Sequence, residues 1–164
     1  MRTVVGDLWA IRMWRVVTTN LTVRADGCAV MGRGVAAQAV EKWPDIPRWL
    51  GGKIRAGQRG LVVHEEHALL FLPVKVHWRD RADVHLLERS LSELAAFAAA
   101  HPGDVIVSPV PGIGFGGLDR GAVDDLLRRH LGDNVVLVER GGEVLERYAD
   151  SLRASVLPDR SLHR

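Results

Sequence analysis

Cysteine is almost absent from this sequence, since Cys28 is the single thiol among 164 residues. One cysteine cannot form an intramolecular disulfide, and no cysteine cluster exists that would build a zinc site. Long apolar runs are missing too: none approaches the roughly 20 residues of a membrane-spanning helix, and no basic stretch followed by a long apolar one opens the chain. We therefore expect a cytoplasmic protein that is neither exported nor embedded in a membrane.

Strong charge of one sign is also missing. The net charge of +2 comes from scattered arginines rather than from a basic block, so it favours anionic partners only weakly. The length suits one domain, which would bury roughly two-thirds of the surface that its unfolded chain exposes. Because apolar periodicity is lost near Ser151, we expect one domain over residues 1–150 and a peripheral or loosely ordered tail over 151–164.

Four segments have the three-to-four-residue apolar spacing of amphipathic helices. Pro44 ends the first, and Pro47 suits the first turn of the second. Asp119 is a plausible N-cap for the fourth. The predicted helices cover 34–43, about 47–57, 83–100 and 119–131.

Short runs rich in β-branched and apolar residues predict strands. The first two are expected to pair with each other, and the next two to form a hairpin across a polar connector. Strands alternate with helices through the second half, which favours an α/β domain with helices on both faces of a sheet. The predicted strands are 2–5, 14–18, 61–63, 68–74, 104–108 and 134–139.

Two glycine-rich loops each join a strand to a helix. In the first, Gly32 and Gly34 let backbone amides approach a ligand, and the following helix start offers unpaired N–H groups. An ordinary strand-to-helix loop explains this spacing equally well. The second loop, from Gly112 to Gly117, matches the dinucleotide-binding fingerprint, with Glu139 as a ribose-binding acid. That fingerprint normally opens its fold, whereas here only about 25 residues follow Glu139. Two such loops at the carboxyl ends of strands can instead converge on one ligand with two adjacent phosphates.

Five segments together resemble a macro domain, and they occur in the order of that family over about residues 3–140. Among macro domains the chain is most similar to the branch of ADP-ribosyl glycohydrolases that includes antitoxins removing ADP-ribose from DNA. The resemblance implies a three-layer α/β/α fold with a mixed, mostly parallel central sheet. The segments are GDLW (6–9), TTN (18–20), VMGRGVAAQ (30–38), LPVKVHW (72–78) and PGIGFGGLD (111–119).

The resemblance also implies a site for ADP-ribose or an ADP-ribosylated DNA or protein. Asp7 would accept a hydrogen bond from the adenine amino group, with the Leu8 amide beside it, and Asn20 would lie near the distal ribose. Lys75 would act at the anomeric carbon of that ribose, and Asp119 would assist as an acid or base unless it only caps its helix. The remaining ligand-binding residues implied are Thr19, Met31, Gly32, Gly34, Val35, Pro111, Gly114, Phe115, Gly116, Gly117 and Leu118.

Ile113, Phe115 and Val76 depart from the family pattern. A partly desolvated lysine can act as a nucleophile, although most lysines at strand ends are simply solvated. The alternatives to a glycohydrolase are an ADP-ribose reader without turnover, a phosphatase of ADP-ribose 1''-phosphate, and a nicotinamide-dependent oxidoreductase. No cofactor is predicted, and the sequence determines neither a toxin partner nor the oligomeric state.

His64 and His67 have the spacing of a short metal-binding pair. No further ligand cluster lies near them in the sequence, so residues of a hairpin turn are the favoured interpretation, and no metal site is predicted.

Overall fold

The computed structural model describes residues 2–10 and 13–139, so the tail predicted over 151–164 lies outside the described residues. Six strands form one sheet in the order β1-β6-β5-β2-β4-β3. Strand β3 runs antiparallel to β4, and all other neighbours are parallel. The strands are β1 (Arg2–Val5), β2 (Trp14–Asn20), β3 (Val62–His64), β4 (Leu69–Lys75), β5 (Ile106–Pro109) and β6 (Val135–Glu139).

The predicted pairing of the first two strands is wrong. Strand β1 lies at the edge and pairs with β6, whereas β2 lies in the middle, between β5 and β4. Parallel partners need a crossover connection and need not be neighbours in sequence. The predicted hairpin of β3 and β4 is confirmed, one residue later than expected.

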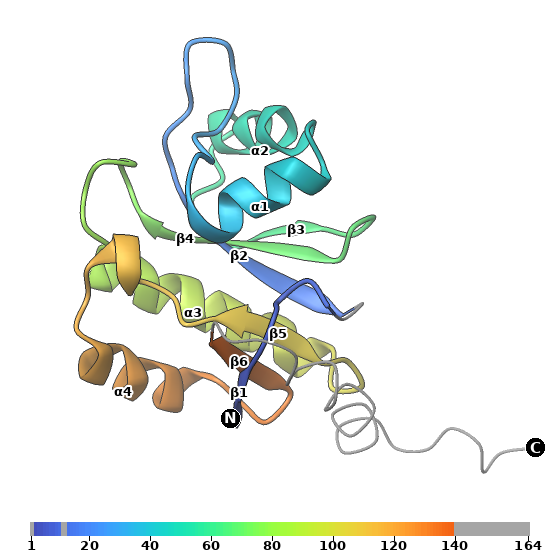
Figure 1. The fold of residues 1–164 in the computed structure, drawn as a ribbon, viewed down its shortest axis with the longest axis vertical. Helices are drawn as coiled ribbons and strands as arrows, with labels where there is room; N and C mark the ends of the chain where they lie inside the picture. Colours follow the sequence, from blue (N-terminus) through green and yellow to red (C-terminus); the bar gives the residue numbers. More distant parts are fainter. Residues whose placement is uncertain (1, 11–12, 140–164) are drawn as a thin grey trace, which may run out of the picture.

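Helices cover both faces of the sheet, as Figure 1 shows: α1 and α2 lie on one side, α3 and α4 on the other. The predicted α/β class with a mixed, mostly parallel sheet between helices is thereby confirmed. None of the described helices is long and apolar enough to cross a bilayer. The helices are α1 (Gly34–Lys42), α2 (Ile46–Arg55), α3 (Val84–Ala100) and α4 (Arg120–His130), with a 3-10 turn η1 (Gly114–Gly116) before α4.

Strand β4 supplies both main cores, because successive side chains of a strand point to opposite faces. Leu70 and Leu72 pack with α3 and α4 on one face. Leu69 and Phe71 pack with α1 and α2 on the other. All four are fully buried, and each contributes roughly 1.5–3 kcal/mol by burial. The middle of the sheet is therefore a rigid support for the loops at its ends.

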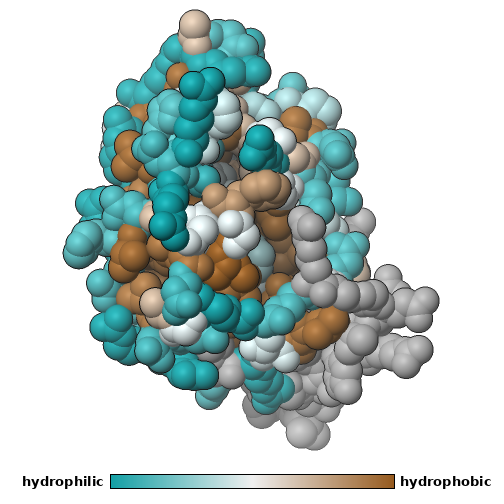
Figure 2. Space-filling view, turned by 60° about the vertical axis from the view of Figure 1, so that its left-hand side comes forward, coloured by the Kyte–Doolittle hydropathy of each residue, from teal (hydrophilic) through white to brown (hydrophobic). Residues whose placement is uncertain are grey.

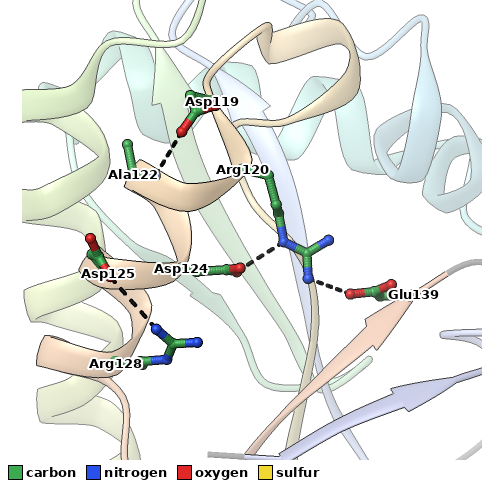
Figure 3. Close-up of polar contacts among 7 residues, drawn as sticks. All are labelled: Asp119, Arg120, Ala122, Asp124, Asp125, Arg128 and Glu139. Carbon is green, nitrogen blue, oxygen red and sulfur yellow. Dashed lines mark hydrogen bonds and ion pairs between the residues drawn. The ribbon is translucent and has the colours of Figure 1, made fainter.

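Caps fix where α3 and α4 begin. The Asp83 side chain accepts a hydrogen bond from the Leu86 amide at 3.0 Å, and the Asp119 side chain accepts one from the Ala122 amide at 3.0 Å (Figure 3). The predicted N-cap role of Asp119 is confirmed.

Candidate functional site

A cavity of about 1020 Å³ opens at the carboxyl ends of β2, β4, β5 and β6. In open α/β sheets this edge is where ligands bind. Figure 2 shows the side of the molecule toward which these ends point, with hydrophobic residues gathered in the middle and hydrophilic residues around them. Both predicted glycine loops line the cavity, together with the end of each of these strands.

Asn20 positions the first loop. Its side-chain nitrogen donates to the Val30 carbonyl at 2.9 Å, and its side-chain oxygen accepts from the Thr22 amide at 2.9 Å. The pairing of β2 with β4 shifts register between Thr19 and Asn20. Such an irregularity changes the direction in which the side chains at a strand end point. Asn20 thus ties the end of a central strand to the loop that enters α1, and it lines the cavity itself.

The start of α1 faces the cavity without a side-chain cap. Its N-cap residue, Arg33, makes no capping hydrogen bond. The first-turn residues Gly34, Val35 and Ala36 line the cavity, and amides in a first turn have no acceptor inside their own helix. Gly34 has a φ of +58°, a conformation that side chains disfavour. The open end of this nine-residue helix is suited to an anion.

The second loop is a tight backbone turn. Gly112, Gly114 and Gly117 all have positive φ angles, of 76°, 62° and 69°. The Leu118 amide donates to the Gly112 carbonyl at 2.9 Å and closes the loop. The amides of Gly116, Gly117 and Leu118 donate inside the loop, so the donors left for a ligand include those at the start of η1.

The two loops meet across the cavity. The guanidinium carbon of Arg33, in the first loop, lies 5.2 Å from the ring centre of Phe115, in the second. A cation over an aromatic face at this separation is attracted to it. The structure therefore brings together the two loops that were predicted from the sequence to bind one ligand.

Lys75 joins the same site from the end of β4. Its ammonium nitrogen lies 3.1 Å from the carbonyl oxygen of Asp80, 3.3 Å from that of Phe115 and 3.5 Å from that of Trp78. These contacts hold the half-buried lysine between the second loop and residues 78–80. A ligand between the glycine loops would lie beside this amine.

Aromatic and cationic side chains form the mouth of the cavity. Phe115 is 64% exposed and Trp78 is 38% exposed, so both rings are open to solvent at the cavity. The guanidinium of Arg79 stacks on Trp78, with its carbon 4.7 Å from the ring centre. Arg33, Phe115, Trp78 and Arg79, which we call the mouth residues, all line the cavity.

Arg120 and Glu139 also line the cavity, and Arg120 was not predicted. Figure 3 shows the Arg120 guanidinium between Glu139 and Asp124, forming an ion pair with each. The hydrogen bonds that Arg120 donates to Glu139 and to Asp124 raise the pKa of Arg120 above its ordinary value. The sequence signal for Arg120 was weak, since an arginine after an N-cap is usually solvated.

The predicted site residues divide into two groups. Those that line the cavity are Thr19, Asn20, Met31, Gly32, Gly34, Val35, Lys75, Gly114, Phe115 and Gly116. Those that do not are Asp7, Leu8, Pro111, Gly117, Leu118 and Asp119. In the second group, Asp7 accepts a hydrogen bond from the Trp9 amide at 2.9 Å, and the buried Leu8 packs against β5 and β6. Both still follow β1 at the same edge, where the Gly6 amide donates to the Glu139 carbonyl.

No family model matches the sequence, and a comparison with curated proteins gives no match. Solved structures do match. The macrodomain of Thermus aquaticus DarG has a TM-score of 0.70 and 25% identity, over 85% of this chain and 97% of that one. The macrodomain of Mycobacterium tuberculosis DarG has a TM-score of 0.68 and 21% identity, over 83% and 95%.

A third match is Thermosipho africanus DarTG in complex with ADP-ribose, with a TM-score of 0.69 and 20% identity. It covers 90% of this chain and 44% of that one. These likenesses agree with the sheet order and with the five sequence segments that resemble macro domains. The chain therefore has the macrodomain fold, and DarG macrodomains are among the structures that it resembles.

Proposed function

We propose that this protein binds ADP-ribose and hydrolyses the bond that joins ADP-ribose to a modified macromolecule. The observation that carries the proposal is the uncapped start of α1, which opens into the same cavity as the second glycine loop. Both loops line that one cavity, and backbone donors from two sides would suit a diphosphate. The structural neighbour DarTG, described in complex with ADP-ribose, supports this ligand.

Lys75 is the proposed catalytic residue. It lies at the second loop, within 3.3 Å of the Phe115 carbonyl, and its nitrogen would lie beside the distal ribose of a bound ADP-ribose. In the hydrolysis, water adds its oxygen to the anomeric carbon, the bond to the acceptor breaks, and the acceptor takes a proton. A cation at this point stabilises the negative charge that develops on the leaving acceptor. A role for Asp119 as an assisting acid or base stays a prediction.

Among acceptors, we favour a single-stranded nucleic acid such as DNA over a protein. The mouth residues combine two exposed rings with two arginines, and such surfaces stack bases and neutralise phosphates. A cytoplasmic location, which the single cysteine favours, belongs to the same proposal.

A reader of ADP-ribose without turnover is the second candidate. One observation favours it: the Lys75 nitrogen already contacts three carbonyl oxygens, so its reach toward a ribose requires breaking some of these contacts.

One experiment separates the two functions. The wild type, Lys75→Ala and Lys53→Ala are incubated with ADP-ribosylated single-stranded DNA and with an ADP-ribosylated protein, while calorimetry measures ADP-ribose binding. Lys53 is the matched control because it lies on α2 over Trp49, away from the cavity. We expect all three to bind ADP-ribose, and Lys75→Ala alone to lose at least about a hundredfold in release from DNA.

If all three bind and none releases ADP-ribose, the protein is a reader. Failure of the wild type to bind ADP-ribose would contradict both candidates. Faster release from protein than from DNA would contradict the preference for nucleic acid alone.

A further inference from the structure

The order of the strands sets the direction in which an elongated ligand lies in the cavity. Lys75 ends β4 and Glu139 ends β6, and between them lie β2 and β5, which lead into the two glycine loops. Neighbouring strands lie about 4.8 Å apart, so the ends of β4 and β6, three places apart in the sheet, are separated by roughly 14 Å. All four strand ends line the one cavity. A ligand with its diphosphate at the loops and its distal ribose at Lys75 therefore extends its adenosine toward β6.

The β6 end of the cavity combines apolar side chains with one ion cluster. Val138 of β6 is buried and lines the cavity, and Val35, which also lines it, packs against the same hydrophobic cluster. Arg120, the first residue of α4, lines the cavity too and forms ion pairs with Asp124 and Glu139. One positive and two negative formal charges leave this cluster net negative, which repels a phosphate. An uncharged, planar base suits this end of the cavity better.

The Arg120 guanidinium is held by its edge. Its Nε donates to Asp124 at 2.9 Å, and its Nη2 donates to Glu139, as Figure 3 shows. The donors of a guanidinium all lie in its own plane, so these bonds do not use its faces. The Arg120 side chain is 45% exposed and lines the cavity, so part of its surface is open to a ligand. Guanidinium planes stack on nucleic-acid bases, and one that is already fixed loses little side-chain entropy in doing so.

We propose that Arg120 holds the base of the bound ADP-ribose, with one face of its guanidinium stacked on the adenine ring. This inference rests on the proposed function, because the two loops and Lys75 determine where the adenosine lies. Asp124 and Glu139 are positioning residues, which act on the ligand only through Arg120. An ion pair between Arg120 and the diphosphate is disfavoured, because two carboxylates already neutralise the guanidinium.

Two substitutions separate stacking from charge. Arg120→Lys keeps the positive charge and loses the planar group, whereas Arg120→Phe keeps a planar group and loses the charge. We expect calorimetry to show ADP-ribose binding weaker by about tenfold in Arg120→Lys, and within about threefold of the wild type in Arg120→Phe. Arg128→Lys is the matched control and should bind like the wild type, because Arg128 lies on the same helix, pairs with Asp125 and does not line the cavity.

Asp124→Asn tests the support of the guanidinium. It keeps the shape of the side chain and weakens the ion pair with Arg120. We expect ADP-ribose binding to be weaker by about threefold when Arg120 is present, and unchanged when Asp124→Asn is combined with Arg120→Phe, which has no guanidinium to hold. A merely structural role of Asp124 would weaken binding equally in both backgrounds.

The order of the two Arg120 variants decides the outcome. If Arg120→Phe binds ADP-ribose no more tightly than Arg120→Lys, the inference is overturned and the proposed function remains intact, provided that the wild type binds. If the wild type does not bind ADP-ribose, the proposed function itself is contradicted, and with it the position assigned to the base.

Discussion

One cavity lies at the carboxyl ends of the parallel strands and another at their amino ends, and different kinds of chemical group line the two. At the carboxyl ends, glycine turns and a helix start present backbone groups to the cavity. At the amino ends, indole rings and titratable side chains do so, among them Trp14, Trp43, Glu66, His67 and Asp104. A backbone site is sensitive to changes that move the chain, whereas a side-chain site is sensitive to changes in its own residues. The predictions below test this contrast.

The largest effect is expected from Gly51→Ala, although Gly51 does not line the carboxyl-end cavity. A Cβ at Gly51 of α2 would lie 2.0 Å from the Gly27 carbonyl oxygen and 2.9 Å from the Ala29 nitrogen. The backbone that leads into the first glycine loop must therefore shift. We expect a loss of about 3 kcal/mol in the free energy of unfolding, measured by urea denaturation, together with weaker ADP-ribose binding.

The adjacent glycine provides the control. A Cβ at Gly52 meets nothing within 4 Å, so Gly52→Ala should gain up to about 1 kcal/mol from helix propensity. If Gly51→Ala is no less stable than Gly52→Ala, the first loop does not depend on this backbone contact.

The next prediction separates binding from stability within the first loop. Gly34→Ala places a side chain at a φ of +58° and should cost about 1 kcal/mol in the free energy of unfolding. Gly32→Ala has no such strain and no protein atom within 4 Å, so its stability should stay near that of the wild type. Because Gly32 lines the cavity, the added methyl group should still weaken ADP-ribose binding in calorimetry. Unchanged affinity in Gly32→Ala would mean that the ligand backbone does not approach this glycine.

Periodicity and end signals made the helices predictable from the sequence. Asp83 caps the start of α3. The observed helix over Val84–Ala100 buries Leu87, Leu91 and Leu94, which lie on its apolar stripe as expected. The partners of β1 were not predictable, because a run such as Arg2–Val5 contains no information about which distant strand it will meet. Pairing in a parallel sheet is decided by crossovers and by the packing of whole helices.

The candidate site was predictable where a glycine pattern or the family resemblance indicated it, as for Asn20 and Lys75, and the pairing of Arg120 with Glu139 was not. The glycines of both loops were visible as a pattern. Arg120 and Glu139 are 19 positions apart and meet only because β6 lies beside β5.

A smaller effect concerns a charged side chain near the backbone site. The Asp83 amide donates to the Val74 carbonyl, so this cap also anchors the carboxyl end of β4. The hydrogen bond from the Leu86 amide lowers the pKa of Asp83 below its ordinary value. The unfolded chain therefore holds the proton more tightly, and the carboxylate stabilises the fold above the ordinary pKa and ceases to do so as the pH falls through the lowered one.

Asp83→Asn keeps a cap without this charge. We expect the wild type to melt at a higher temperature than the variant at about pH 7, and the difference to shrink at about pH 3. A difference that is the same at both values would mean that the charge of the cap contributes nothing.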